Sequence, residues 1–184
     1  MLIRADDALL LVVDLQARLM PAVHGADAIV GRALDLIASA ADLGVPVMVS
    51  EHCVDKLGGS VPSVRDAAEA AGASFVFKRH FSCAREPGFL DAARAMGRHQ
   101  VVVVGAEAHV CVLQTVLGLL EAGHRVFVVA DAAGSRHEPD KVLALQRMQA
   151  AGAAIVNTEM VLFEWLACAD HPAFRQVLPR IKRG

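Results

Sequence analysis

The sequence predicts an α/β fold built on a parallel sheet. Short apolar and β-branched runs alternate with longer stretches of helical periodicity, which is typical of repeated βα units. Hydrophobic residues make up 55% of the 184-residue chain, and strands that are buried on both faces of a covered sheet require such an excess. The length fits one domain, residues 1–184, and no linker, internal repeat or low-complexity segment divides it.

Six runs have the length and composition of strands. The first reads LLLVVD, Pro46 is compatible with a strand only near the start of the second, and Gly105 closes the fourth, which reads QVVVV. The expected strands are Leu9–Asp14, Val45–Ser50, Ser74–Phe77, Gln100–Val104, Arg125–Ala130 and Ala153–Asn157.

Helical patterns fill most of the stretches between these strands. After the first strand, apolar residues recur at helical spacing until Gly44, and a later helix ends in the same way at Gly123. Polar loops are expected over Glu51–Pro62 and Lys78–Pro87. The expected helices are Ala26–Leu43, Val64–Ala71, Phe89–Met96, Cys111–Ala122, Pro139–Ala151 and Glu159–Leu166, followed by an irregular C-terminal tail.

Charge, hydropathy and cysteine spacing argue against several classes of protein. The formal net charge of −2 gives no general electrostatic case for nucleic acid as a partner, because phosphates demand basic patches. No apolar run has the length of a membrane span, and the N-terminus lacks a signal-peptide pattern. The four cysteines form no CxxC or zinc-ligand spacing, so we expect free thiols in a cytoplasmic protein.

Several polar residues come directly after strands, and these are the candidates for a site. In open parallel sheets, ligands bind beyond the carboxyl ends of the strands, where the strand order reverses. The residues in such positions are Asp14, Glu51, His52, Lys78, the turn Ala106–Cys111, and Asp131. For Asp131, a structural role in holding the loop after it is favoured over a role in the site.

Three of these residues form a chemically coherent set. Cys111 begins a helix, where free N–H groups favour a thiolate and can hold an oxyanion. Asp14 can take the thiol proton, and Lys78 can balance the local charge. Each also has an ordinary structural interpretation: a carboxylate that caps backbone amides, a lysine that reaches solvent, and a cysteine that packs as a small hydrophobe.

At these residues the sequence resembles the isochorismatase-like cysteine hydrolase superfamily, which includes nicotinamidases and other small amidohydrolases. The matching segments read VVDLQ at 12–16, KRHFS at 78–82 and GAEAHVCV at 105–112. They occur in the family's order, and the resemblance covers almost the whole chain. It implies a three-layer αβα sandwich around a six-stranded parallel sheet, with Rossmann-like strand order 3-2-1-4-5-6.

The resemblance also implies the site residues and their roles. Asp14, Lys78 and Cys111 would form a catalytic triad. A cis peptide bond would join Ala106 to Glu107, and the backbone N–H groups of Glu107 and Cys111 would form the oxyanion hole. In the implied strand order Lys78 lies two strands from Asp14, so their backbones are roughly 10 Å apart. Strand twist and the long lysine side chain must close this gap.

The region after the second strand departs from nicotinamidases, which carry an Asp-x-His pair and further histidines there. The possible zinc ligands in this region are Glu51, His52, Cys53 and Asp55, but residues adjacent in sequence rarely bind one ion together. We therefore expect no metal and no cofactor, and the loop is closer to uncharacterised isochorismatase-domain proteins than to nicotinamidases. The residues expected to line a substrate pocket are Gln16, His52, Ser82 and His109.

The leading functional prediction is a cysteine-dependent hydrolase that cleaves a C–N (amide) bond of a small molecule through a thioester. One alternative is an isochorismatase-type vinyl-ether hydrolase, which tends not to depend on a cysteine. Another is a non-catalytic oligomeric interaction protein on the same fold. A dinucleotide-binding function is excluded because no GxGxxG follows the first strand. The family and the apolar composition also predict a homo-oligomer.

Overall fold

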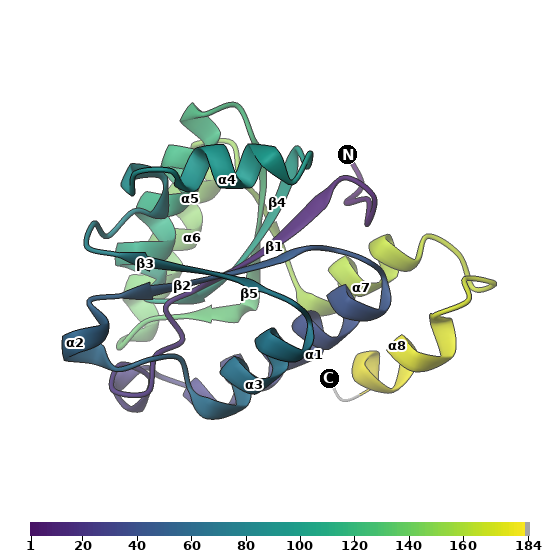
Figure 1. Cartoon of the computed structure of the whole chain (residues 1–184), viewed down its shortest axis with the longest axis horizontal. Helices are drawn as coiled ribbons and strands as arrows, with labels where there is room; N and C mark the ends of the chain where they lie inside the picture. The colour runs from purple at the N-terminus through teal and green to yellow at the C-terminus, as the bar shows by residue number, and fades with distance from the viewer. Residues whose placement is uncertain (183–184) are drawn as a thin grey trace.

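The computed structural model describes residues 1–182, which form a six-stranded sheet with helices on both faces (Figure 1). All strand pairs are parallel and the order is β3-β2-β1-β4-β5-β6, so the predicted fold class and strand order are confirmed. The strands are β1 Ala8–Val13, β2 Val47–His52, β3 Ser74–Lys78, β4 Gln100–Ala106, β5 Arg125–Gly134 and β6 Ala154–Val156.

The helices divide between the two faces of the sheet. One face carries α1 Ala26–Asp42, α3 Pro62–Ala70, α7 Thr158–Leu166 and α8 Phe174–Ile181, whose apolar residues pack in one cluster with Val12 and Val49. The other face carries α4 Phe89–Ala95, α5 Leu113–Glu121 and α6 Glu138–Ala150, whose apolar residues pack in a second cluster with Leu11 and Val103. The remaining helical segments are η1 Met20–Ala22, α2 Val54–Leu57, η2 Cys83–Arg85 and η3 Ala108–Val112.

The central strands β1 and β4 approach each other closely at their carboxyl ends. Gly105 has φ of +129°, and a Cβ atom at this position would overlap the backbone of Val13 in β1. Only glycine avoids this clash and adopts such a backbone conformation readily. The glycine therefore lets the ends of β1 and β4, which precede Asp14 and the turn to Cys111, lie side by side.

Two parts of the chain differ from the sequence prediction. The C-terminal tail was expected to be irregular, but Phe174–Ile181 forms α8. It is held because Val177 is buried and Arg180 forms a 2.6 Å ion pair with Asp42 of α1. The expected helix Cys111–Ala122 also begins earlier: a π-helical turn over Ala108–Val112 precedes α5, so Cys111 lies inside this turn.

Smaller differences concern the loops. The expected loop 51–62 contains the short helix α2, and β5 continues past residue 130 to Gly134, so that Asp131 lies inside a strand. Within residues 1–182, no helix is long and apolar enough to cross a membrane.

Candidate active site

Asp14 and Lys78 form a buried ion pair at the carboxyl edge of the sheet. Lys78 Nζ lies 2.6 Å from Asp14 Oδ2, and both side chains are fully buried. The backbone gap of two strands is closed because Lys78 is the last residue of β3 and its long side chain crosses the end of β2. Burial, the largest single influence, lowers the pKa of Lys78, but Asp14, Cys111 and Cys83 together raise it by more, so the pKa of Lys78 is raised overall.

The backbone of Asp14 turns its carboxylate toward this pair. If the side chains of β1 continued to alternate, Asp14 would lie on the same face of the sheet as Val12. Ser50 and Lys78 lie on the opposite face, which they share with Met48 and Val76. Asp14 has φ of +50°, an uncommon conformation for a residue other than glycine. This left-handed residue places the carboxylate on the face that carries α4, α5 and α6.

Both oxygens of the Asp14 carboxylate accept hydrogen bonds. Ser50 Oγ donates to Oδ1 over 2.8 Å, while Lys78 Nζ donates to Oδ2 and also to the carbonyl oxygen of Phe81 over 2.9 Å. Ser50 was not among the residues singled out from the sequence. The signal was present, because Ser50 is a polar residue near the end of an apolar strand, beside the strand that leads to Asp14.

Cys111 lies in the π-helical turn that follows β4. Its residue is 6% exposed, and the preceding Ala106–Glu107 peptide bond is cis. Burial raises the pKa of the Cys111 thiol, and the charge of Asp14 adds to this, whereas the charge of Lys78 opposes it. The pKa of Cys111 is thus raised above the ordinary value for cysteine, which is opposite to the lowering that its sequence position alone predicted.

A polar network holds the turn that contains Glu107 and His109. The Glu107 carboxylate is 2.7 Å from Arg136 Nε, an ion pair whose angle does not satisfy hydrogen-bond geometry. His109 Nδ1 lies 2.9 Å from Ser135 Oγ, and its Nε2 is 3.9 Å from Glu107. These contacts join the end of β4 to the end of β5, so they position the backbone N–H groups expected to form an oxyanion hole.

Gln16 binds backbone atoms of the loop after β2. Its amide nitrogen donates to the carbonyl oxygens of His52 and Gly58, and its amide oxygen accepts from the backbone N–H of His52. The side chain is fully buried. The structure therefore places Gln16 behind the site as a support for residues 52–58, in contrast to the expected place in the pocket wall.

Of the other residues expected to line a pocket, His52 lies beside Lys78, whereas the Ser82 side chain is bound to α5. His52 pairs with Lys78 in the β2–β3 register, and its ring centroid lies 5.2 Å from that of Phe81. Ser82 is nearly buried and donates to the carbonyl oxygen of Gln114 in α5. The next residue, Cys83, is fully buried; burial and then the charge of Asp14 raise the pKa of its thiol.

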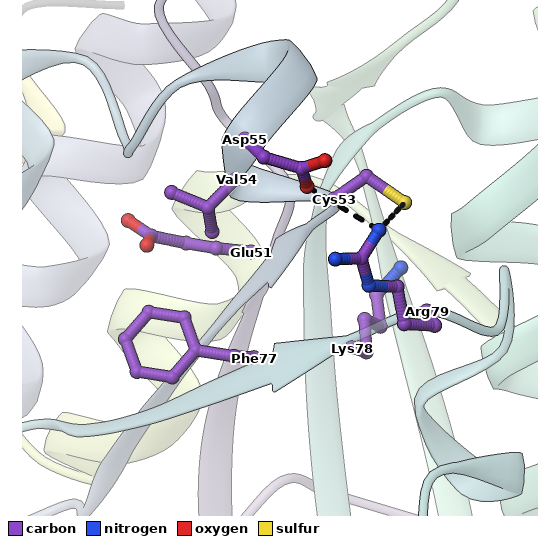
Figure 2. Close-up of a pocket in the computed structure, with 7 residues that line it drawn as sticks. All are labelled: Glu51, Cys53, Val54, Asp55, Phe77, Lys78 and Arg79. Carbon is purple, nitrogen blue, oxygen red and sulfur yellow. Dashed lines mark hydrogen bonds and ion pairs between the residues drawn. The ribbon is translucent and has the colours of Figure 1, made fainter.

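A cavity of about 270 Å³ lies at the end of β3, and of Asp14, Lys78 and Cys111 it is Lys78 that lines it (Figure 2). Glu51 and Phe77 extend together to one side of the strands, while Cys53 and Arg79 lie on the other. Glu51 and Phe77 alternate with Ser50 and Lys78 and so face away from the triad. Neither Asp14 nor Cys111 is among the residues that line this cavity.

The residues considered as possible zinc ligands are used for other contacts. Glu51 Oε1 accepts from Arg65 and from both the backbone and the hydroxyl of Ser60, each over 2.7 Å. Arg79 lies 3.3 Å from Asp55 and 3.9 Å from the sulfur of Cys53. Among residues 1–182, no three His, Cys, Asp or Glu side chains are grouped to hold a metal ion.

Asp131 lies apart from this set. Its Oδ1 accepts from the backbone N–H and the hydroxyl of Thr158, the first residue of α7. The sequence interpretation, in which Asp131 ties down the loop after it, is corrected: Asp131 is bound to the start of α7.

Comparison with known proteins places the chain in a family. The model of the isochorismatase domain matches residues 8–160. Isochorismatase domain-containing protein 1 of Danio rerio is 36% identical over 170 residues, which cover 92% of this chain and 59% of that protein. The chain thus spans less than two thirds of the length of that relative.

Solved structures of similar fold cover nearly all of the chain. MAR1 ribonuclease from Caenorhabditis elegans has a TM-score of 0.91 at 32% identity, with 99% of this chain and 93% of that chain covered. YcaC from Pseudomonas aeruginosa, with hexane-2,5-diol and covalent acrylamide, has a TM-score of 0.90 at 28% identity, over 97% and 91% of the two chains. YcaC from Escherichia coli, described as an octameric hydrolase of unknown specificity, has a TM-score of 0.86 at 25% identity, over 99% and 97%.

Proposed function

This chain belongs to the isochorismatase domain family, and on that premise we propose that it is a cysteine-dependent hydrolase of a small amide. The observation that carries the proposal is the fully buried Asp14–Lys78 ion pair of 2.6 Å, whose carboxylate interacts with the thiol of Cys111. A buried charge pair is costly unless its geometry is good, and such perturbed groups cluster at functional sites.

In the proposed reaction, Asp14 acts as general base and Cys111 as nucleophile. Asp14 takes the thiol proton while the sulfur attacks the amide carbonyl carbon, and the N–H groups of Glu107 and Cys111 hold the resulting oxyanion. The intermediate collapses to a thioester as Asp14 returns the proton to the leaving nitrogen. Water, deprotonated by Asp14, then attacks the thioester, and the acid product leaves as Cys111 regains its proton.

The protonated resting thiol fits this sequence of steps. Because the pKa of Cys111 is raised, the proton must be removed as attack occurs, which is the task of a general base in contact with the thiol. Lys78 forms a 2.6 Å ion pair with Asp14 and so balances the charge of its carboxylate. The covalent acrylamide in the P. aeruginosa YcaC structure supports a reactive nucleophile on this fold.

We do not extend to this chain the ribonuclease activity named for the C. elegans neighbour. Binding of an RNA backbone needs surplus basic side chains, and this chain has a net charge of −2. The vinyl-ether alternative is separable by experiment, because that chemistry would survive the loss of Cys111.

We further propose that the chain is a homo-oligomer located in the cytoplasm. The octameric state of E. coli YcaC and several exposed apolar side chains support assembly. Among these are Phe77, Phe81, Leu143, Met160 and Phe163. Light scattering after size-exclusion chromatography tests this proposal, and a monomer at micromolar concentration would contradict it.

The function is tested by ammonia release from a set of small primary amides, together with intact-protein mass spectrometry of rapidly quenched reactions. We expect an acyl adduct on Cys111 in the wild type, and loss of both adduct and ammonia release in Cys111→Ala. Cys168→Ala is the matched control, because Cys168 is exposed and should retain full activity. Ammonia release that persists in Cys111→Ala, or its absence across the whole set, would overturn the proposal.

A further inference from the structure

The outer edge of β3 carries backbone groups that the sheet does not use. β3 pairs with β2 alone, and the carbonyl oxygen of Lys78 accepts a hydrogen bond from the backbone N–H of Cys53, just after β2. The backbone groups of successive residues in a strand point to alternate sides, so those of Phe75 and Phe77 face away from β2. Within residues 1–182, no backbone group from a turn or loop bonds to these outward groups.

The side chains along this edge are apolar. Phe75 and Phe77 lie on one face of β3, where the guanidinium of Arg65 lies 4.6 Å from the centre of the Phe75 ring. Phe77 is 63% exposed, and Figure 2 shows its ring extending away from the strand. Edge strands are commonly protected from pairing by charged side chains or proline. Residues 74–77 contain neither, so this edge is open to another strand.

The outward groups of β3 match those of a second β3. In an antiparallel ladder, two residues that lie opposite each other can exchange both of their backbone hydrogen bonds. If two copies of β3 meet across a two-fold axis at Val76, Phe75 of each copy lies opposite Phe77 of the other. Both pairs then exchange two hydrogen bonds, which uses every outward donor and acceptor. A shift of one residue would instead place them opposite groups that already bond to β2.

Side chains and charges also fit this arrangement. A two-fold axis normal to the sheet keeps Phe75 of one copy and Phe77 of the other on the same face, where aromatic cross-strand pairs are favourable. The acidic Glu69 precedes β3 and the basic Arg79 follows it, with side chains 57% and 70% exposed. Antiparallel pairing brings the acidic start of one strand beside the basic end of the other, and position 79 lies opposite Ala73.

We propose that two copies of this chain pair antiparallel through β3, with the two-fold axis at Val76, so that their two sheets become one continuous sheet. The proposal rests on the homo-oligomer proposed above and names one of its contacts. The same register places Ser74 of the second copy opposite Lys78, on the face of the sheet that carries the ion pair with Asp14. Each candidate active site therefore lies beside the neighbouring copy.

Disulfide trapping tests the register. The full chain carries Val76→Cys together with Cys168→Ser, which removes an exposed native thiol. The Cα atoms of the two copies of position 76 should lie about 4.5 Å apart, within reach of a disulfide, so mild oxidation should give a covalent dimer that a reductant splits. Ser74→Cys in the same background is the matched control. It lies on the same face and is more exposed, but its two copies should lie roughly 14 Å apart at about 3.4 Å per residue.

A second test changes the outward backbone groups. Phe77→Pro removes one outward N–H and leaves the ladder with β2 intact, because proline is tolerated where the N–H of an edge strand faces solvent. We expect this variant to halve the molar mass measured by light scattering. Phe77→Leu keeps the N–H and an apolar side chain, so it should retain the wild-type mass. The fluorescence of Trp165, buried in α7, confirms that both variants are folded.

Three results would overturn this inference: crosslinking of Ser74→Cys as efficient as that of Val76→Cys, crosslinking of neither, or a folded Phe77→Pro variant that keeps the wild-type mass. If the wild type is an oligomer, these results refute the β3 contact and leave the proposed homo-oligomer standing. A monomeric wild type would refute both.

Discussion

An aspartate lies at each end of β1 and pairs with a basic side chain, but one pair is partly exposed and the other is buried. Asp7 precedes the strand and pairs with Arg125 at 2.8 Å, where the two side chains are 17% and 44% exposed. Asp14 follows the strand and pairs with Lys78 at 2.6 Å, where both are fully buried. The two distances hardly differ, whereas the burial does. Loss of one partner should therefore cost little stability at the exposed pair and much more at the buried pair.

The largest expected effect is on catalysis at the buried end. Asp14→Asn removes the base and should lower amide hydrolysis by about 10²- to 10⁴-fold, measured as kcat/KM for ammonia release. Asp7→Asn is the control at the other end of the strand and should keep the wild-type rate. An equal loss of activity in both variants would mean that Asp14 stabilises the fold and does not act as the catalytic base.

The next expected effect is on stability. Lys78→Met leaves Asp14 buried without a counter-charge and should lower the free energy of unfolding by about 3–5 kcal/mol, measured by urea denaturation. Arg125→Met removes a half-exposed partner and should cost at most about 1 kcal/mol. Because a single variant can fail to fold, the double variant Asp14→Leu/Lys78→Met is included. It should recover most of the loss, and failure to recover would show that packing of the lysine stem, not charge, is decisive.

A smaller expected effect concerns the second oxygen of Asp14. Ser50→Ala removes a hydrogen bond to a charged oxygen and should lower kcat/KM about tenfold, with Ser50→Thr restoring most of it. Ser82→Ala is a matched control, because Ser82 is also nearly buried but donates to the carbonyl oxygen of Gln114. If both alanine variants lose the same activity, the Ser50 hydroxyl has no specific role in holding the carboxylate.

The smallest expected effect is on the ionisation of the thiol. Burial and the charge of Asp14 raise the pKa of Cys111, so wild-type labelling by iodoacetamide should increase into the alkaline range, above the ordinary midpoint for cysteine. Removing the negative charge favours the thiolate, so Asp14→Asn should shift the midpoint to lower pH even though hydrolysis is lost. Mass spectrometry of labelling at Cys111 across pH 6 to 10 measures this, and an upward shift would contradict the assigned electrostatics.

The sequence was sufficient to predict the sheet and the edge at which Asp14 and Lys78 meet. Apolar runs that alternate with helical periodicity predicted the strands, and Asp14 and Lys78 were identified because each is a charged residue at the end of such a run. The family resemblance supplied the strand order, which the structure confirms.

Other features depend on contacts that no local pattern encodes. α8 is held by Val177 and Arg180 against α1, far away in the sequence. The raised pKa of Cys111 results from burial and from Asp14, a residue 97 positions earlier in the numbering, whereas local position alone predicted a stabilised thiolate. The role of Gln16 depends in the same way on the fold of residues 52–58.

Lys78, the lysine of the proposed triad, lies on an edge strand of the sheet. β3 pairs with β2 alone, and its first residues are more exposed than those of β1 or β4. Edge segments with few buried contacts exchange their amide hydrogens and open at lower cost than the core does. On heating, inactivation should therefore begin before the fluorescence of Trp165, buried in α7, changes, and the gap between the two curves would measure how independently the edge of the sheet melts.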